Sequence, residues 1–593
     1  MIGRVRTSRV LAGTLTGAIA AALLTACGGD SGPEQLAEQF ADALVRDDAA
    51  AAAGLTTDPA AATETISALF AGLGTSGVYS PANVAETDDG ATFDLDAAWN
   101  FGSAPAGGER LWEYTTNARA TDTPEGWRID WDPAVLAPGA SDTTTLRYTP
   151  TSGTPAPVLT EDGRALMSQQ TVTLVQYDQT TDLGSLAGIL STVVPTITPE
   201  SLAGSLADAQ GAPATAVALR ESDLAPIRDR LAPLSGIVLV PQARLLTDDK
   251  DLSSPLFGGI TDEWQRRADE AAGWAVQSVA QDGTATTIAG EEGRDVPALR
   301  TTLDLGRQQA AQQSVAAEGR QAALVAIRPS TGEIVAMAQN DPAAALGPIA
   351  LTGLYPPGST FKTVTTAAAL GSGEVTPDTV LPCPGTENIE GRQIPNDDNF
   401  DLGAVPLHTA FAQSCNTTMG RLAVGMEPDR LQQTALSLGL GIDYTTPALT
   451  TVTGSVPPAD TPAARVETAI GQGAVTASPF GMALVAAAIA NGTPPAPSIL
   501  AGEQGTADQT PAPLDPAVLA DVREMMRETV ANGTASSLAR YPDLLGKTGT
   551  AEDGTGSAHG WFVGIRGDLA FAVFVADGDS SAPALQIAGS FLE

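Results

Sequence analysis

The 593-residue chain uses arginine for almost all of its positive charge, because 28 of its 31 basic residues are Arg and 3 are Lys. The lysines are Lys250, Lys362 and Lys547, and the last two lie in short motifs that also contain hydroxyl side chains. A guanidinium supplies charge as well as an amine does, but it cannot be deprotonated to act as a base. Retaining Lys at these two positions therefore indicates chemistry that requires an amine, in the second half of the chain.

Three motifs follow one another in that half. The first is Ser359–Lys362, which follows a Pro-Pro-Gly turn and precedes an apolar helical stretch, so Ser359 and Lys362 share one face of a helix start. The second is Ser414–Asn416 (Ser-Cys-Asn), and the third is Lys547–Thr550 (Lys-Thr-Gly-Thr). A serine hydroxyl is a poor nucleophile until a base takes its proton. A lysine can be that base when a second lysine lowers its pKa.

The order of these motifs resembles the Ser-x-x-Lys, Ser-x-Asn and Lys-Thr-Gly set of penicillin-binding proteins and β-lactamases. The segments 471–473 (Gly-Gln-Gly), 490–492 (Ala-Asn-Gly) and 561–564 (Trp-Phe-Val-Gly) add to this likeness. Residues 298–593 resemble the transpeptidase domain of class B penicillin-binding proteins. The resemblance implies an α+β fold, with an antiparallel sheet covered by helices, and a serine-type peptidoglycan D,D-transpeptidase without cofactor or metal.

The resemblance also implies a role for each motif residue. Ser359 attacks the penultimate D-Ala carbonyl of a peptidoglycan stem peptide, and Lys362 is the general base of this acylation. Ser414 passes a proton to the leaving amine, while Asn416 and Lys547 hold its orientation. An amine of a neighbouring stem peptide then takes the acyl group and forms the cross-link.

Substrate binding is expected from the rest of the third motif. Thr548, Gly549 and Thr550 would hold the carboxylate of a D-Ala-D-Ala end, or the equivalent carboxylate of a β-lactam antibiotic. The backbone N–H groups of Ser359 and Thr550 would form the oxyanion hole. A membrane glycosyltransferase of the cell-wall machinery is a candidate partner.

The chain begins with a predicted secretory signal over residues 1–26. It has a basic start, an uncharged and mostly apolar stretch of 17 residues over 10–26, and a Leu-Thr-Ala sequence directly before Cys27. This ending resembles a bacterial lipobox, which predicts lipidation of Cys27 and a flexible tether over 27–33. The alternative is an uncleaved membrane anchor, since 17 residues lie at the short end of a spanning helix. Both place the remaining chain on the outer face of the cytoplasmic membrane, facing the cell wall.

Two domains are expected between the tether and the transpeptidase domain. In the first, over 34–145, Leu36, Phe40 and Leu44 form one apolar helix stripe, and strand-like runs follow it. Its end, 127–131 (Trp-Arg-Ile-Asp-Trp), resembles the cone-shaped, nuclear transport factor 2-like N-terminal domain of methicillin-resistance-type penicillin-binding proteins. This domain shows no converging titratable cluster, so the sequence favours a spacer.

Residues 146–297 mix strands, expected over 170–176 and 236–240, with helices expected over 202–210 and 222–232. They resemble the elongated, non-catalytic pedestal, of the dimerisation type, of class B penicillin-binding proteins. The whole chain is therefore expected to be a multidomain α+β protein.

Charge and cysteine content exclude other classes. A net charge of −38 disfavours nucleic-acid binding. Two histidines and three cysteines, without Cys-x-x-Cys or His-Glu-x-x-His spacing, disfavour a zinc site or a histidine-based triad. With Cys27 lipidated, Cys383 and Cys415 remain in an exported chain, which favours a disulfide over two separate buried thiols.

Two other functions share the motifs. A β-lactamase must hydrolyse its acyl-enzyme, and the chain has no Glu between Glu427 and Glu467 to serve a class A mechanism. Its additional N-terminal domains are also superfluous for a diffusible hydrolase. A catalytically silent penicillin-binding scaffold is the other alternative, and the intact motifs argue against it.

Overall fold

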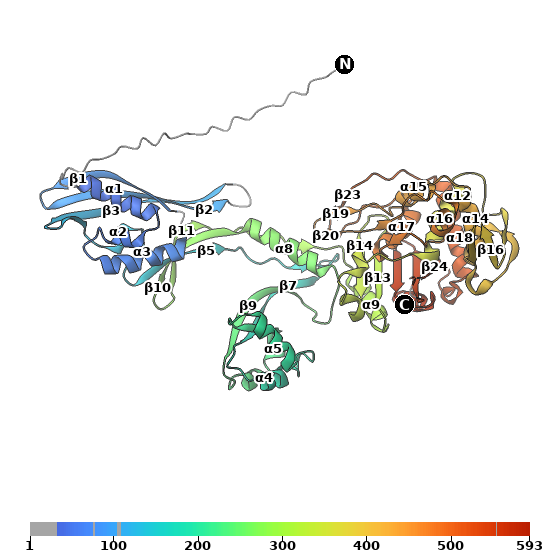
Figure 1. The fold of residues 1–593 in the computed structure, drawn as a ribbon, viewed down its shortest axis with the longest axis horizontal. Coiled ribbons are helices and arrows are strands. Elements are labelled where there is room, and N and C mark those ends of the chain that lie inside the picture. The colour runs from blue at the N-terminus through green and yellow to red at the C-terminus, as the bar shows by residue number, and fades with distance from the viewer. Residues whose placement is uncertain (1–31, 75–76, 104–107, 553, 555) are drawn as a thin grey trace, which may run out of the picture. The chain divides into compact units, whose positions relative to one another are not determined.

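The computed structural model describes residues 32–593 apart from 75–76, 104–107, 553 and 555. The chain forms two compact units, which Figure 1 traces. Of the described residues, the first contains those up to Thr151 together with Gly273–Gly293, and the second contains those of Ser152–Ala272 and Arg294–Glu593. The predicted signal 1–26 and the predicted lipidation site Cys27 lie outside the described residues.

The first unit begins with three helices, α1 (Pro33–Val45), α2 (Ala49–Ala53) and α3 (Pro59–Leu73). The predicted apolar stripe of α1 is buried, and the Asp58 carboxylate accepts a hydrogen bond from the Ala61 N–H to cap α3. The helices share a core with a four-stranded antiparallel sheet in the order β1-β2-β3-β4. Its strands are β1 (Gly77–Thr87), β2 (Gly90–Ser103), β3 (Glu109–Thr123) and β4 (Gly126–Ile129).

A second sheet of this unit joins segments that are far apart in the sequence. Strands β5 (Thr144–Thr151), β10 (Gly273–Ala280) and β11 (Ala285–Glu291) pair antiparallel in the order β11-β10-β5. Trp274 and Val276 of β10 lie in the same core as Leu146 of β5. Residues 146–151 and 273–291, which the sequence assigns to the pedestal, thus belong to the first unit. The boundaries 34–145, 146–297 and 298–593 remain predictions.

The second unit contains the rest of the expected pedestal. Its sheet has the order β12-β6-β7-β8, with β9 also paired to β7. These strands are β6 (Val158–Leu159), β7 (Ala165–Tyr177), β8 (Ala214–Arg220), β9 (Ile237–Thr247) and β12 (Leu299–Arg300). The helices are α4 (Leu183–Leu190), α5 (Pro199–Asp208), α6 (Glu221–Leu224), α7 (Arg228–Leu231) and α8 (Phe257–Ala271). The single helix expected over 222–232 is wrong, because Pro226 interrupts it between α6 and α7.

The C-terminal part is built on a five-stranded antiparallel sheet in the order β14-β13-β26-β25-β24. Its strands are β13 (Ala322–Ile327), β14 (Ile334–Gln339), β24 (Leu544–Glu552), β25 (Ala558–Arg566) and β26 (Ala570–Val575). The two expected hairpins at the ends of this region form β13–β14 and β25–β26. The third motif lies on β24, at one edge of the sheet, and the predicted α+β fold is confirmed.

Helices bury both faces of this sheet. Alternate residues of β13 lie in different hydrophobic cores. One core contains Ala323, Val325 and Ile327 together with helix α17 (Pro479–Asn491). Ala322, Leu324 and Ala326 instead lie with α9 (Leu305–Ala316) and α19 (Ala582–Phe591). Because every residue of β13 is buried, the strand reads as one apolar run rather than an alternating pattern.

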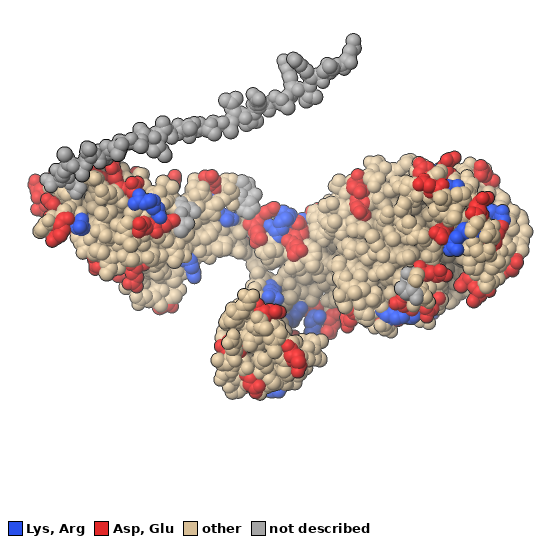
Figure 2. All heavy atoms as spheres, viewed as in Figure 1, with Lys and Arg blue, Asp and Glu red and all other residues tan. Residues whose placement is uncertain are grey.

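Among the described residues, no helix combines the length and the apolar character needed to cross a membrane. Acidic side chains are spread over the visible face of the molecule, while Lys and Arg form smaller groups (Figure 2).

Candidate active site

The three motifs lie on different elements of the second unit. Ser359 lies in a 3-10 turn, Gly358–Phe361, and Lys362 begins helix α12 (Lys362–Leu370). Ser414 follows α13 (Leu407–Ala412) and directly precedes α14 (Asn416–Val424). Lys547 lies on β24. Ser359, Ser414 and Asn416 are half-buried, whereas both lysines are fully buried.

The first two motifs meet at the Lys362 amine. Its Nζ donates to the Ser414 carbonyl oxygen at 2.6 Å and to Asn416 Oδ1 at 2.6 Å, and it lies 3.0 Å from Ser414 Oγ. Ser414 adopts a left-handed backbone conformation with φ of +62°, which is uncommon for a residue other than glycine. Such strained residues gather at functional sites, and this one directs both its oxygens toward the lysine.

The third motif reaches the same serine. Lys547 Nζ is 3.0 Å from Ser414 Oγ and donates to the Thr548 carbonyl oxygen at 3.1 Å. The Ser414 hydroxyl therefore lies within hydrogen-bonding distance of both amines. The structure brings Lys362, Ser414, Asn416 and Lys547 into one polar cluster.

Both lysines have a lowered pKa. Burial lowers the pKa of Lys362 well below its ordinary value, the charge of Lys547 lowers it further, and Asp397 acts in the opposite direction. Burial lowers the pKa of Lys547 to about 7. An amine with a depressed pKa loses its proton at a pH where ordinary lysines stay charged. This is the condition that a general base requires.

Two glycines hold the turn that carries Ser359. The Gly358 N–H donates to the Gly471 carbonyl oxygen at 3.0 Å, and both glycines have positive φ, +52° and +70°. A Cβ on Gly358 would overlap the Thr550 carbonyl oxygen, and a Cβ on Gly471 would overlap the Gly358 carbonyl oxygen. The turn that carries Ser359 is thus held between β24 and the turn at 471–473. Only glycine fits either contact.

The remaining third-motif residues line the same edge of the sheet. Thr548 is buried and its hydroxyl lies 2.5 Å from the hydroxyl of Thr534, whereas Thr550 is half-buried. Gly549 leaves no room for a side chain, since a Cβ there would come within 2.9 Å of the Thr360 methyl group. Thr534 was not predicted from the sequence, because it belongs to no motif.

Cys383 and Cys415 form a disulfide, with Cα atoms 6.2 Å apart, and both residues are fully buried. Thr417 and Thr418 of α14 reinforce this connection. Their hydroxyls donate to the carbonyl oxygens of Pro384 at 3.0 Å and Pro382 at 2.8 Å. The second motif is therefore tied to the segment around residue 383.

Asn396 is a buried residue that the sequence did not single out. Its side-chain Oδ1 accepts hydrogen bonds from the N–H groups of Asn416 at 2.8 Å and Thr417 at 3.2 Å. Its Nδ2 donates to the carbonyl oxygens of Pro384 and Phe400, each at 2.9 Å. It precedes Asp397 in an acidic loop and matches no short motif that sequence reasoning could recognise.

The described residues also contain features without assigned chemistry. Within the described ranges, no three His, Cys, Asp or Glu side chains gather so that they could hold a metal ion.

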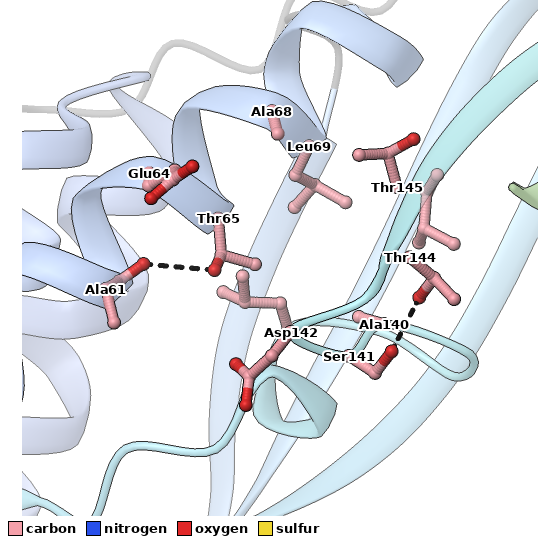
Figure 3. Close-up of a pocket in the computed structure, with 12 residues that line it drawn as sticks. Ala61, Glu64, Thr65, Ala68, Leu69, Ala140, Ser141, Asp142, Thr144 and Thr145 are labelled. Carbon is pink, nitrogen blue, oxygen red and sulfur yellow. Dashed lines mark hydrogen bonds between the residues drawn. The ribbon is translucent and has the colours of Figure 1, made fainter. Parts of the chain in front are cut away.

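A cavity of about 320 Å³ in the first unit lies between α3 and residues 136–146 (Figure 3). The Thr65 hydroxyl in its lining donates to the Ala61 carbonyl oxygen, and the Ser141 and Thr144 hydroxyls are hydrogen-bonded to each other. We assign this cavity no ligand.

Comparisons with known families match two parts of the chain. Residues 322–593 match the family described as penicillin binding protein transpeptidase domain. Residues 32–144 match the NTF2-like N-terminal transpeptidase domain family. The first match contains all three motifs, and the second contains helices α1–α3 and strands β1–β4 of the first unit.

Curated relatives match over a shorter region. Peptidoglycan D,D-transpeptidase PbpA of Mycobacterium tuberculosis is 31% identical over 304 residues, covering 43% of this chain and 60% of the relative. Peptidoglycan D,D-transpeptidase MrdA of Acinetobacter baumannii is 28% identical, covering 43% of this chain and 44% of the relative. The chain thus spans about 60% of the length of PbpA.

A solved structure of penicillin-binding protein A from M. tuberculosis, a ceftriaxone acyl-enzyme complex, is also similar to this chain. It is 26% identical, with a TM-score of 0.46, and the match covers 51% of this chain and 80% of that one.

Proposed function

Because the chain belongs to the class B penicillin-binding proteins, we propose that it is a peptidoglycan D,D-transpeptidase that cross-links stem peptides through an acyl-enzyme on Ser359. The observation that carries this proposal is the convergence of two buried amines, Lys362 and Lys547, on the Ser414 hydroxyl beside the Ser359 turn. Neither a metal nor a cofactor takes part in the proposed reaction.

Acylation begins with proton transfer from Ser359 to Lys362. A neutral Lys362 has two N–H groups for its 2.6 Å contacts with Ser414 and Asn416, which leaves its lone pair for the incoming proton. The Ser359 oxygen bonds to the penultimate D-Ala carbonyl carbon, and the C–N bond to the terminal D-Ala then breaks. The departing nitrogen takes the proton from Lys362 through the Ser414 hydroxyl, and free D-Ala leaves.

The second half of the reaction retraces the same proton route. The amine of a neighbouring stem peptide attacks the ester carbonyl and gives its proton through Ser414 to Lys362. The ester C–O bond breaks, and Ser359 recovers its proton from Lys362. The products are a cross-linked peptide and free enzyme.

The third motif is proposed to bind the substrate carboxylate. The Lys547 ammonium and the hydroxyls of Thr548 and Thr550 would hold that carboxylate at the edge of β24. The N–H groups of Ser359 and Thr550 would stabilise the oxyanion, and each such donor is worth about 10²–10³ in rate in other enzymes. A β-lactam would acylate Ser359 by the same attack. Its opened ring stays attached, so the leaving group does not depart and the adduct persists.

We further propose a lipid anchor at Cys27 and a site of action on the outer face of the cytoplasmic membrane. The support is the Leu-Thr-Ala-Cys ending of the apolar stretch. A membrane glycosyltransferase of the cell-wall machinery is the proposed partner, since the enzyme would act on strands that such a partner supplies.

The time course of intact mass after penicillin treatment tests the proposed function. A stable adduct on the wild-type protein that is absent from Ser359→Ala supports the transpeptidase. An adduct that is rapidly lost indicates a β-lactamase-type hydrolase, and the absence of any adduct indicates a silent scaffold. Release of D-Ala from a synthetic stem peptide, with transfer to an added amine, then tests the transpeptidase reaction itself.

The pH dependence of acylation should be bell-shaped. The rate rises with pH as Lys362 loses its proton at its lowered pKa, because only the neutral amine is a base. It falls as Lys547, with a pKa of about 7, loses the charge that binds the carboxylate. Because the two amines interact, the two apparent pKa values of this profile describe the pair of amines together. Stopped-flow acylation by a fluorescent penicillin measures both.

The control for this profile is a penicillin ester, which lacks the carboxylate. It should retain the acid limb and lose the alkaline limb. A wild-type rate that is independent of pH between about 5 and 9 would contradict the assignment of both amines.

Replacing Cys27 by Ala should abolish lipid modification and change the attachment of the protein to membranes. The measurement is incorporation of radiolabelled fatty acid in cells that express either form. Equal incorporation into wild type and Cys27→Ala would show that the lipoprotein interpretation is wrong, and a spanning anchor would replace it.

A further inference from the structure

Helix α14 carries the second motif, yet its own N-cap residue does not cap it. The N-cap position is Cys415, whose side chain accepts no hydrogen bond from a backbone N–H of the helix start, and its sulfur is bonded to Cys383. A helix start leaves its first N–H groups without partners inside the helix. Two of them, on Asn416 and Thr417, bind the Asn396 side-chain oxygen instead. Asn396 thus caps α14 from another part of the chain.

The same side chain joins two further segments. Its amide nitrogen donates to the carbonyl oxygens of Pro384 and Phe400, and its exposed fraction is only 2%. The neighbouring Pro395 carbonyl accepts a hydrogen bond from Asn416 Nδ2 at 2.8 Å. The backbone N–H of Asn416 and its side chain are therefore both held by residues 395–396.

Orientation of Asn416 matters because its Oδ1 binds Lys362 Nζ at 2.6 Å. With Nδ2 held by Pro395, the amide of Asn416 can present only its oxygen to the lysine. The connection runs from Asn396 through the start of α14 to the amine proposed to act as the base.

We propose that Asn396 is a positioning residue for acylation, which caps α14 in trans and fixes the Asn416 oxygen against Lys362. The inference rests on the proposed function, since it concerns the base of that reaction. It assigns to Asn396 no contact with substrate.

The structure offers a matched control in Asn340, a second buried Asn of the same unit. Its Oδ1 accepts from the N–H groups of Ala322 and Ala343, at 3.0 and 3.2 Å. Its Nδ2 donates to the carbonyl oxygens of Glu318 and Arg320, at 2.7 and 2.6 Å. Asn340 also caps a helix, α10 (Asp341–Ala344), but none of these partners belongs to the three motifs. Replacing either Asn by Leu removes the same kinds of bond.

The experiment compares Asn396→Leu with Asn340→Leu in the acylation of Ser359 by a fluorescent penicillin, with melting curves for both. We expect Asn396→Leu to lower the acylation rate constant about tenfold or more, because small displacements of catalytic groups have effects of that order. The dissociation constant of the non-covalent penicillin complex should stay within about twofold, as the third motif is untouched. Asn340→Leu should lower the melting temperature while leaving the acylation rate constant within about twofold.

A second readout separates positioning from simple stability. In Asn396→Leu the Asn416 oxygen is displaced from Lys362, and this acceptor no longer favours the ammonium form, so the pKa of Lys362 falls. The acid limb of the pH profile should therefore move to lower pH. Asn396→Asp keeps the cap acceptor but adds a negative charge next to Asn416, so its acid limb should move to higher pH. This second variant also serves if Asn396→Leu does not fold.

The inference is overturned if Asn396→Leu loses no more activity than Asn340→Leu, or if neither Asn396 variant moves the acid limb. A wild-type protein that forms no adduct on Ser359 would instead refute the proposed function, and the inference would fall with it. Wild-type acylation with unaltered Asn396 variants would refute the inference alone.

Discussion

Replacing Lys362 by Arg should slow acylation of Ser359 by a fluorescent penicillin by about 10²–10⁴-fold, the usual contribution of a general base. The positive charge survives this change, so a purely electrostatic role predicts a mild loss. A guanidinium keeps its proton at any working pH, so a base role predicts a severe one. Lys362 is fully buried, and its pKa is depressed by that burial and by Lys547. The measurement is the acylation rate constant at neutral pH.

The control for Lys362→Arg is Lys250→Arg, which changes the one lysine that lies outside the motifs. Lys250 is exposed, and its replacement should leave acylation unchanged. Melting curves of both variants must accompany the rates, because the longer guanidinium has to fit a fully enclosed position. A folded Lys362→Arg protein that acylates within a few-fold of wild type would remove Lys362 from the mechanism.

The residues of the polar cluster could be predicted because they are rare and local. Only three lysines exist in the chain, and the two that lie in motifs meet at Ser414 in the structure. Each motif is short enough to be recognised within a single element. The hairpins β13–β14 and β25–β26 are likewise local, since the strands of each are joined by a turn.

The supporting contacts could not be predicted, because they join residues far apart in the sequence. Asn396 caps a helix that begins 20 residues later, and strand β10 pairs with β5 from more than 120 residues away. Neither contact changes the local hydrophobic period that sequence reasoning uses. Pro226 is different, since a proline inside an expected helix is a local signal, and it should have divided the helix expected over 222–232.

Replacing Gly471 by Ala should lower the acylation rate constant by about 10²-fold, the loss that a displacement near 1 Å can cause. A Cβ at position 471 would overlap the Gly358 carbonyl oxygen, and the Gly358 N–H donates to the Gly471 carbonyl oxygen at 3.0 Å. Relief of that overlap must move Gly358, and Ser359 directly follows it. The displacement would shift both the Ser359 oxygen, the proposed nucleophile, and the Ser359 N–H group proposed for the oxyanion hole.

Gly473→Ala is the matched control, because Gly473 has nearly the same backbone conformation, with φ of +72° against +70°. Both substitutions therefore incur the same left-handed strain of about 1–2 kcal/mol. The nearest atom to a Cβ at 473 is the Glu467 carboxylate at 3.1 Å, the mobile end of a side chain. Melting curves should thus show a destabilisation in both variants, and only Gly471→Ala should lose acylation. Equal rates for the two variants would mean that the turn at 471–473 does not position Ser359.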